Sequence, residues 1–463
     1  MQMQSARAPR GLPWAGTLGV LDMFFSRRFG IHGLAIAIVG GALIGASFSR
    51  PAVAVQPTEP ELAVAAAAVS PSLSEVTTPT AVSLEVASLP PPTPTVTSLA
   101  QTTDQVQATV TFDPRLGLPQ WLRAIHDLPL WSSGDSSASS NGSLPAGSAY
   151  VKPLGPFGDS RIEVYFPGDG EHPATQAWVD TANVQASGVP PWIAPPAATT
   201  AQPGEPASLP VAPQRTGDDP PPNTTAVHIA IIDDASGQMI YGEQPNTQVP
   251  QASTTKIATT IVALERDPDL SQRIKVTVSA SQMVAHDGSS TMGIEPGLSV
   301  SLDTLLHGMM LPSGNDAAEQ VAVSLGGSRE QYVEWMNEEV AALGLKDTHF
   351  VNPSGMDAEG HYSSAYDMAM LARYAMRNST FRDLAADMTY AGDGFKMANL
   401  NRLLGVYPGA DGVKIGFTDA AQKTFVASAV HDGHRVFVSL MRSEDLPGDS
   451  TALFNWVWNN FNW

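Results

Sequence analysis

The sequence has no cysteine among its 463 residues. This absence excludes disulfide scaffolds, thiolate metal sites and cysteine nucleophiles. Basic residues are also scarce: 25 Lys and Arg stand against 45 Asp and Glu, a formal net charge of −20. Phosphate binding needs clustered Lys and Arg, so nucleic acid is excluded as the main partner.

One long apolar run is present, at residues 29–48 (FGIHGLAIAIVGGALIGASF). Twenty helical residues at ~1.5 Å each span ~30 Å, which is enough to cross a bilayer core. Four arginines lie within residues 1–28, whereas residues 51–114 contain no Lys or Arg. This bias places residues 1–28 in the cytoplasm and the rest outside. The run predicts a retained membrane anchor, or a long signal peptide cleaved near Ala46 or Ala54 that would leave a secreted protein.

Composition indicates two linkers. Residues 49–120 are rich in Pro, Ala, Val, Thr and Ser, which predicts a disordered tether. Residues 191–224 are dominated by proline, which predicts a semi-rigid linker. We expect this second linker to isolate the C-terminal domain from the segment before it, so that a fragment starting near Thr225 would fold alone.

Residues 121–190 lie between these linkers and predict a small all-β domain. Short apolar stretches separated by Gly, Pro and Ser turns give candidate strands at 149–152, 161–166 and 176–179. In its pattern and its closing Trp178-Val179 strand, the segment resembles a bacterial SH3-like domain. The resemblance implies either binding to a wall polymer or a folded spacer.

Residues 225–463 carry the candidate chemistry. A buried-strand pattern at 227–233 precedes Ser253 and Lys256, which open a helical pattern at i, i+3 spacing. An amine with a depressed pKa can act as the base for a serine nucleophile. The alternative interpretation is a helix-capping serine followed by a solvated lysine.

Two further motifs favour the catalytic interpretation. Ser313-Gly314-Asn315 lies in a turn between two helical patterns, and Lys414-Ile415-Gly416 precedes a predicted hairpin with strands at 424–430 and 435–441. In this order the three motifs resemble those of the D-alanyl-D-alanine carboxypeptidases, the low-molecular-mass penicillin-binding proteins. The resemblance covers about residues 226–463 and extends to the flanking segments 348–356, 360–363, 367–375, 399–411 and 454–456.

The resemblance implies an α/β (α+β) transpeptidase-like fold, with a five-stranded antiparallel sheet flanked by helices and a helical subdomain. It implies that Ser253 is the acyl-forming nucleophile and Lys256 its base. Ser313 would relay protons to the leaving amine, and Asn315 would orient Lys256 and bind a substrate amide. Lys414 would attract the terminal carboxylate of the substrate.

The rest of the third motif completes the implied substrate site. The backbone N–H groups of Ser253 and Phe417 would form an oxyanion hole, with Gly416 between Lys414 and that hole. Ile415 replaces the family's Thr. We expect its side chain to lie beside Lys414 without offering a donor, and Thr418 to compensate in part.

The implied function is a serine-type carboxypeptidase that trims the terminal D-Ala of peptidoglycan stem peptides and is inhibited by β-lactams. It would act in cell wall biogenesis and cell shape. The site needs no cofactor and no metal. The apolar run at 29–48 would replace the family's usual C-terminal amphipathic anchor.

Three alternatives are weighed against this function. A D,D-endopeptidase would use the same residues, and a catalytically weak penicillin-binding or wall-binding protein would retain them. A β-lactamase is disfavoured, because no Glu between the second and third motifs has Asn four residues later.

Overall fold

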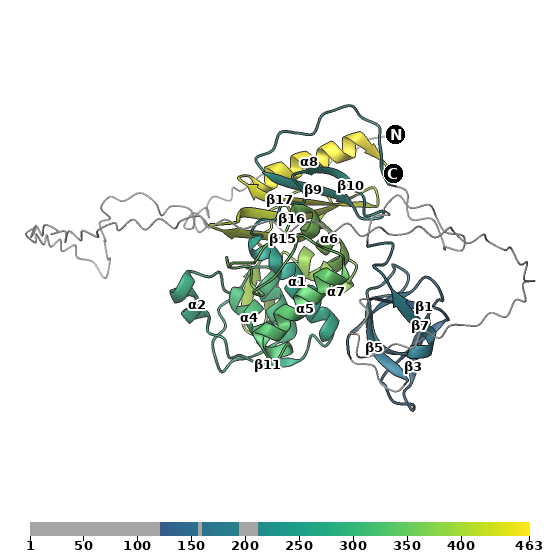
Figure 1. The fold of residues 1–463 in the computed structure, drawn as a ribbon. Helices are drawn as coiled ribbons and strands as arrows, with labels where there is room; N and C mark the ends of the chain where they lie inside the picture. Colours follow the sequence, from purple (N-terminus) through teal and green to yellow (C-terminus); the bar gives the residue numbers. More distant parts are fainter. Residues whose placement is uncertain (1–120, 156–159, 194–211) are drawn as a thin grey trace, which may run out of the picture. The chain divides into compact units, whose positions relative to one another are not determined.

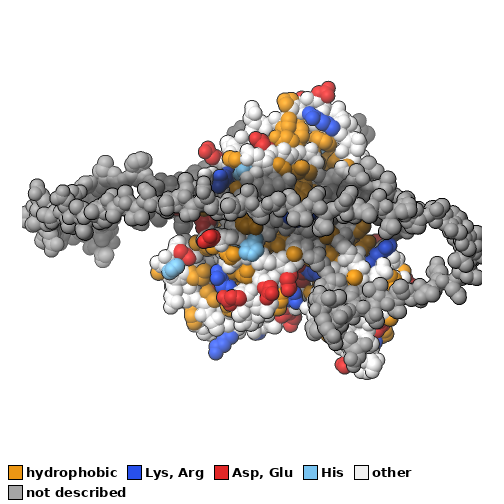
Figure 2. All heavy atoms as spheres, in the orientation of Figure 1, with side chains coloured by type: hydrophobic (Ala, Val, Ile, Leu, Met, Phe, Trp, Pro, Cys, Tyr) orange, Lys and Arg blue, Asp and Glu red, His pale blue; other side chains and the backbone are white. Residues whose placement is uncertain are grey.

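The computed structural model describes residues 121–155, 160–193 and 212–463 (Figure 1). The predicted membrane span, the first linker and much of the second lie outside these residues. No helix within the described ranges is both long and apolar enough to cross a membrane. Figure 2 shows acidic, basic and apolar side chains interspersed over the coloured part of one face.

The first folded part, residues 121–187, is termed the β-segment. Its seven strands form an antiparallel sheet in the order β3-β2-β6-β5-β4-β1-β7, and the three predicted strands are present as β4, β5 and β6. Alternate residues of β5, such as Ile162 and Val164, point into a core that the β-segment builds by itself. The bounds are β1 (Trp121–Ala124), β2 (Leu128–Trp131), β3 (Ser140–Leu144), β4 (Tyr150–Pro153), β5 (Arg161–Phe166), β6 (Thr175–Asp180), η2 (Thr181–Asn183) and β7 (Val184–Ser187).

The second part, residues 214–463, is termed the C-terminal segment. It is built on a five-stranded antiparallel sheet in the order β10-β9-β17-β16-β15, as the family resemblance implies. The predicted strand at 227–233 is β9, and the predicted hairpin is β16 and β17. The bounds are β9 (His228–Asp233), β10 (Met239–Glu243), β15 (Ala410–Thr418), β16 (Gln422–His431) and β17 (His434–Ser443).

Helices cover both faces of this sheet. The helix α8 packs on one face and α6 on the other, which explains why every residue of β9 is buried (Figure 1). The helices are η3 (Ala252–Thr255), α1 (Lys256–Arg266), α2 (Ala280–Asp287), α3 (Leu302–Met310), α4 (Asn315–Leu325), α5 (Arg329–Ala342), α6 (Ala365–Ala375), α7 (Ser379–Ala386) and α8 (Leu446–Asn460). Three short strand pairs complete the segment: β8 (Gln214–Arg215) with β18 (Phe461–Asn462), β11 (Arg273–Lys275) with β12 (Ser299–Ser301), and β13 (Thr389–Gly392) with β14 (Phe395–Ala398).

Two helices differ from the others at their N-termini. Side chains cap α2, α3, α5, α6, α7 and α8, whereas α1 and α4 have no side-chain cap. These two helices begin at Lys256 and Asn315. The polar residues that precede them are therefore not explained by helix capping.

The β-segment packs against the C-terminal segment, and the described residues of both belong to one compact unit. The indole N–H of Trp121 donates to the Ala342 carbonyl at 2.8 Å, and its ring lies edge-on to Tyr374. Arg266 Nη1 donates to the Leu154 carbonyl at 2.8 Å. Trp121 and Leu154 share one apolar cluster with α1 and α6. The two parts are therefore in contact, and whether a fragment starting near Thr225 folds alone stays a prediction.

A buried ion cluster lies in this contact. The Nζ of Lys152, on β4, contacts the carboxylates of Glu265 on α1 and Glu339 on α5. The hydroxyl of Tyr374 donates to Glu265 Oε1 at 2.5 Å. Burial, together with the neighbouring Glu339 carboxylate, raises the pKa of Glu265 to about 8, and Lys152 acts in the opposite direction. One cation of the β-segment thus compensates two carboxylates of the C-terminal segment.

Lys152→Met tests this cluster, because it removes the ammonium and keeps an unbranched apolar chain. Removing one partner of a buried ion pair costs ~3–5 kcal/mol, and we expect the free energy of unfolding to fall by that amount at pH 8. A carboxyl whose folded pKa is raised, as at Glu265, contributes stability that is present below its unfolded pKa and lost as the pH rises through the folded value. Without the Lys152 ammonium, the stability lost when Glu265 ionises is larger. The difference in unfolding free energy between the variant and the wild type should therefore be smaller at pH 5 than at pH 8.

Urea denaturation of the full chain at both pH values measures the deficit. The matched control is Lys346→Met, which removes an exposed lysine. Equal unfolding free energies for the two variants at pH 8 would contradict the assignment.

Candidate active site

Ser253 lies in the 3₁₀ turn η3, directly before α1. The Nζ of Lys256 lies 2.9 Å from Ser253 Oγ, as the i, i+3 spacing predicts. Lys256 is 0% exposed, so the alternative interpretation with a solvated lysine is wrong. The pair has the geometry of a hydroxyl beside an amine that can accept its proton.

Three oxygens surround the Lys256 amine. Besides Ser253 Oγ, they are Asn315 Oδ1 at 2.7 Å and the Ser354 carbonyl oxygen at 2.6 Å. Burial lowers the pKa of Lys256 well below its usual value, and the nearby Lys414 ammonium lowers it further. Both effects favour the neutral amine, which is the form that can accept a proton.

Ser313 lies in the turn between α3 and α4, where the sequence places it. Its φ of 65° is in the left-handed region, and strained residues of this kind cluster at functional sites. The N–H of Asn315 donates to the Ser290 carbonyl at 2.7 Å and fixes the end of the turn. Ser313 is buried, but among the described residues no hydrogen bond joins its hydroxyl to Lys256 or Lys414.

Lys414 lies on β15, the edge strand of the sheet, and is 2% exposed. Its Nζ donates to the Ile415 carbonyl at 3.0 Å. Burial lowers the pKa of Lys414 to about 7. The site therefore holds two buried lysines whose charges disfavour each other.

Gly416 allows β15 to approach the nucleophile. A Cβ at this position would lie 2.7 Å from the Ser253 backbone nitrogen and 2.6 Å from Thr424 Oγ1. The Thr424 hydroxyl is fixed, because it donates to the Gln251 carbonyl at 2.9 Å. Only glycine therefore brings this part of the strand against the Ser253 N–H, where the sequence analysis places one donor of the oxyanion hole.

Ile415 does not lie beside Lys414. The strand register places Ile415 in one row with Phe425 and Leu440, and it packs against the apolar cluster that includes α8 residues. Lys414 pairs with Val426, which belongs to the cluster on the other face. The expectation that Ile415 lies next to Lys414 is wrong, because successive side chains of a strand point to opposite faces.

Thr418 already has a partner for its hydroxyl. Its Oγ1 donates to Asp357 Oδ1 at 2.7 Å, and the Ala420 N–H donates to the other Asp357 oxygen at 3.2 Å. A hydroxyl has one proton to donate. In this arrangement Thr418 therefore does not supply the donor that was expected to compensate for Ile415. Phe417, the residue before it, is 63% exposed.

Ser354, whose carbonyl contacts the Lys256 amine, lies outside the three motifs. The turn is held by Asn352, whose Oδ1 accepts from the Gly355 N–H at 2.7 Å. Gly355 has a φ of 89°, and a Cβ there would collide with the Ala252 carbonyl. The sequence Asn-Pro-Ser-Gly at residues 352–355 is typical of a turn, but it does not indicate which carbonyl faces the amine.

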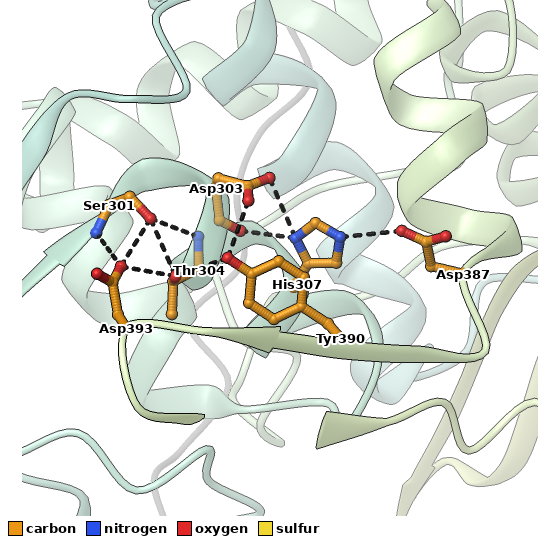
Figure 3. A network of polar contacts seen from close by, with 7 residues as sticks. All are labelled: Ser301, Asp303, Thr304, His307, Asp387, Tyr390 and Asp393. Carbon is orange, nitrogen blue, oxygen red and sulfur yellow. Dashed lines mark hydrogen bonds and ion pairs between the residues drawn. The ribbon is translucent and has the colours of Figure 1, made fainter. Parts of the chain in front are cut away.

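A polar network holds the N-terminal end of α3 against the β13–β14 hairpin (Figure 3). Its members are Ser301, Asp303, Thr304, His307, Asp387, Tyr390 and Asp393. The Asp393 carboxylate accepts from the Ser301 N–H at 2.7 Å, and His307 Nε2 lies 3.0 Å from Asp387 Oδ2. Because α3 leads into the turn of Ser313, this network fixes the direction from which that turn enters the site.

The fold and the Ser253–Lys256 pair have the arrangement of a serine nucleophile beside its base. The family model described as D-alanyl-D-alanine carboxypeptidase matches residues 215–444. The chain is 36% identical to DacB2 of Mycobacterium tuberculosis over 255 residues, which cover 52% of this chain and 86% of the relative. It is also 36% identical to DacF of Bacillus subtilis over 206 residues, which cover 43% of this chain and 52% of the relative. The chain therefore belongs to the D-alanyl-D-alanine carboxypeptidase family, although its match spans only about half the length of DacF.

Two solved structures are also similar. The Streptomyces K15 DD-transpeptidase is 29% identical, with 52% of this chain and 100% of that chain covered and a TM-score of 0.49. The D-alanyl-D-alanine carboxypeptidase from Mycobacterium tuberculosis is 33% identical, with 53% and 96% covered and a TM-score of 0.49.

Gly416→Ala should block the site without altering its charges. The added methyl group would press on the Ser253 backbone nitrogen, and we expect acylation by a fluorescent penicillin to slow by ~10²-fold or more, the effect of losing one oxyanion donor. The control is Gly188→Ala, because a Cβ there meets nothing within 4 Å. Similar labelling rates for the two variants would show that β15 can move away from η3.

Ile415→Thr should affect packing more than recognition. The loss of apolar contact on the α8 side should cost ~1–2 kcal/mol of stability. Because the side chain faces away from Lys414, kcat/KM should change by less than about threefold, both on a peptide ending in D-Ala-D-Ala and on an ester lacking that carboxylate. A tenfold rise confined to the peptide would contradict this placement.

Proposed function

We propose that this chain is a serine-type D-alanyl-D-alanine carboxypeptidase that removes the terminal D-Ala of peptidoglycan stem peptides. The observation that carries the proposal is the buried Lys256 amine 2.9 Å from Ser253 Oγ, with a second buried lysine at 414. Family membership supports the same chemistry.

In the acylation step, Ser253 Oγ attacks the carbonyl carbon of the penultimate D-Ala, and the neutral Lys256 amine takes the hydroxyl proton. The developing oxyanion is held by the backbone N–H groups of Ser253 and Phe417. Asn315 accepts a hydrogen bond from Lys256 at 2.7 Å and keeps the amine directed at the hydroxyl.

In the release step, the peptide C–N bond breaks and terminal D-Ala leaves with a proton relayed by Ser313. Lys414 attracts the carboxylate of that D-Ala. Water then attacks the acyl carbon while Lys256 takes one of its protons. The bond between that carbon and Ser253 Oγ breaks, and Lys256 passes the proton to Oγ as the shortened peptide leaves.

Two other activities fit the same residues and are separated by assay. A D,D-endopeptidase would cut a crosslinked dimer faster than a linear pentapeptide. A penicillin-binding protein with little catalysis would be labelled by penicillin and release no D-Ala. We favour the carboxypeptidase because the hydroxyl, the amine and its three oxygen partners are all in hydrogen-bonding positions.

The remaining parts suggest where the enzyme works. We propose that residues 29–48 anchor it in the membrane with the catalytic part outside, or are cleaved to release it. We propose that the β-segment is an SH3-like wall-binding domain or a spacer. Its contacts through Lys152 and Trp121 support a β-segment that is docked on the C-terminal segment rather than mobile relative to it.

Ser253→Ala should abolish covalent labelling by fluorescent penicillin and D-Ala release, because only the nucleophilic oxygen is lost. Ser143→Ala, at an exposed position of β3, is the control and should behave as the wild type. A covalent adduct on the Ser253→Ala variant would assign the nucleophile elsewhere.

Lys256→Ala should lower the acylation rate by ~10²–10⁴-fold, the usual contribution of a general base. Thermal denaturation of the same sample shows whether the variant is folded. A rate within tenfold of the wild type would mean that another group takes the Ser253 proton.

A further inference from the structure

Glu319 is a partly buried carboxylate that the proposed mechanism does not use. It lies on α4 with its side chain 17% exposed. Its Oε2 accepts from Arg329 Nε at 2.9 Å, and its Oε1 accepts from Ser354 Oγ at 3.5 Å. Arg329 is the more exposed partner, at 44%, so the carboxylate connects the surface to the interior.

The inner partner, Ser354, leads directly to the catalytic amine. Its carbonyl oxygen accepts from Lys256 Nζ at 2.6 Å. Its hydroxyl lies 3.2 Å from Asn352 Oδ1 and 3.5 Å from Glu319 Oε1, so Glu319 shares this hydroxyl with Asn352. Asn315 and Glu319 are four residues apart on α4, so both lie on the face that is turned toward α1. One helix face thus contacts the Lys256 amine directly through Asn315 and indirectly through Glu319.

The charged groups around the Lys256 amine shift its pKa in opposite directions. Lys414 on β15 disfavours the charged form of Lys256, whereas Glu319 and Asp316 on α4 favour it. His361, in the loop before α6, is also close enough to interact with Lys256, and burial lowers its pKa to about 4, so it is neutral near pH 7. Asp316 is already engaged, because it accepts from the N–H groups of residues 292–294.

No ion pair joins Glu319 directly to Lys256 among the described residues. The carboxylate therefore acts through Ser354 and through its field. Burial raises the pKa of Glu319, and the Arg329 guanidinium opposes this shift and favours the carboxylate. Arg329 thus helps to keep a negative charge behind Ser354.

We propose that Glu319 is a positioning residue of the acylation step, which holds the Ser354 turn behind the Lys256 amine and supplies the negative charge that balances Lys414. The proposal rests on the proposed function, because it assumes that Lys256 is the base for Ser253. It adds a residue that no sequence motif includes and that acts on the amine through the Ser354 turn.

The test is the pH dependence of acylation by a fluorescent penicillin, using the full chain purified in detergent. The acid limb of this profile reports the conversion of Lys256 to its neutral form. Glu319→Gln keeps the shape and removes the charge, so the limb should move to lower pH by about 0.5 unit or more. Arg329→Gln removes the cation that favours the charged form of Glu319, so burial should neutralise part of that carboxylate and the limb should move to lower pH as well, by a smaller amount.

Glu330→Gln is the matched control, because it removes an exposed acid next to Arg329 and should leave the limb in place. Shifts of the acid limb to lower pH in both the Glu319 and the Arg329 variants support the proposal, because a general loss of folding would lower the labelling rate at every pH without moving the limb. If the Glu319→Gln variant does not fold, the shift of the acid limb in the Arg329→Gln variant alone decides the outcome. If the acid limbs of the Glu319 and Arg329 variants coincide with that of the Glu330→Gln control, the proposal is overturned. A wild type without labelling would instead overturn the proposed function.

Discussion

The site depends on the burial of the Lys256 amine. An ammonium group taken out of water costs several kcal/mol unless it is compensated, so a buried lysine tends toward its neutral form. Here the amine meets oxygens from its own turn, from α4 and from the Ser354 turn. These elements are far apart in the sequence, and their packing must be correct before the amine is satisfied. The same burial that makes the lysine a base therefore also fixes how the helices assemble around it.

The helix α1 carries a second buried charge, at its other end. Lys256 is its first residue, where the helix dipole is positive, and Glu265 lies in its last turn, where the dipole is negative. Each group lies at the end of the helix that disfavours its charged form. For Lys256 this helps to produce a base, whereas for Glu265 it creates a cost that Lys152 of the β-segment offsets. The contact between the two segments is thus tied to the helix that bears the base.

The sequence predicted the parts of the site that depend on local spacing. The i, i+3 relation of Ser253 and Lys256, the turn at Ser313 and the strands around Lys414 follow from helical and strand periodicity, and the structure has each of them. It did not predict Ser354, because the group that matters there is a backbone carbonyl, which every residue has. Nor did it predict the contact of Lys152 with Glu339, 187 residues away, because no local pattern encodes such a pairing. The proline-rich linker gave no indication of this contact, because a linker's composition does not encode which surfaces meet across it.

The error at Ile415 shows what the site requires of β15. A motif read as three consecutive letters suggests three side chains facing one ligand, but a strand presents only every second residue to a given face. On the side of the nucleophile, β15 presents the Lys414 amine and the absent side chain of Gly416. The Ile415 side chain packs instead against the apolar cluster that includes Phe425 and residues of α8. The identity of residue 415 is therefore constrained by packing beneath α8, so a departure from the family motif there leaves the nucleophile, the base and the oxyanion donor intact.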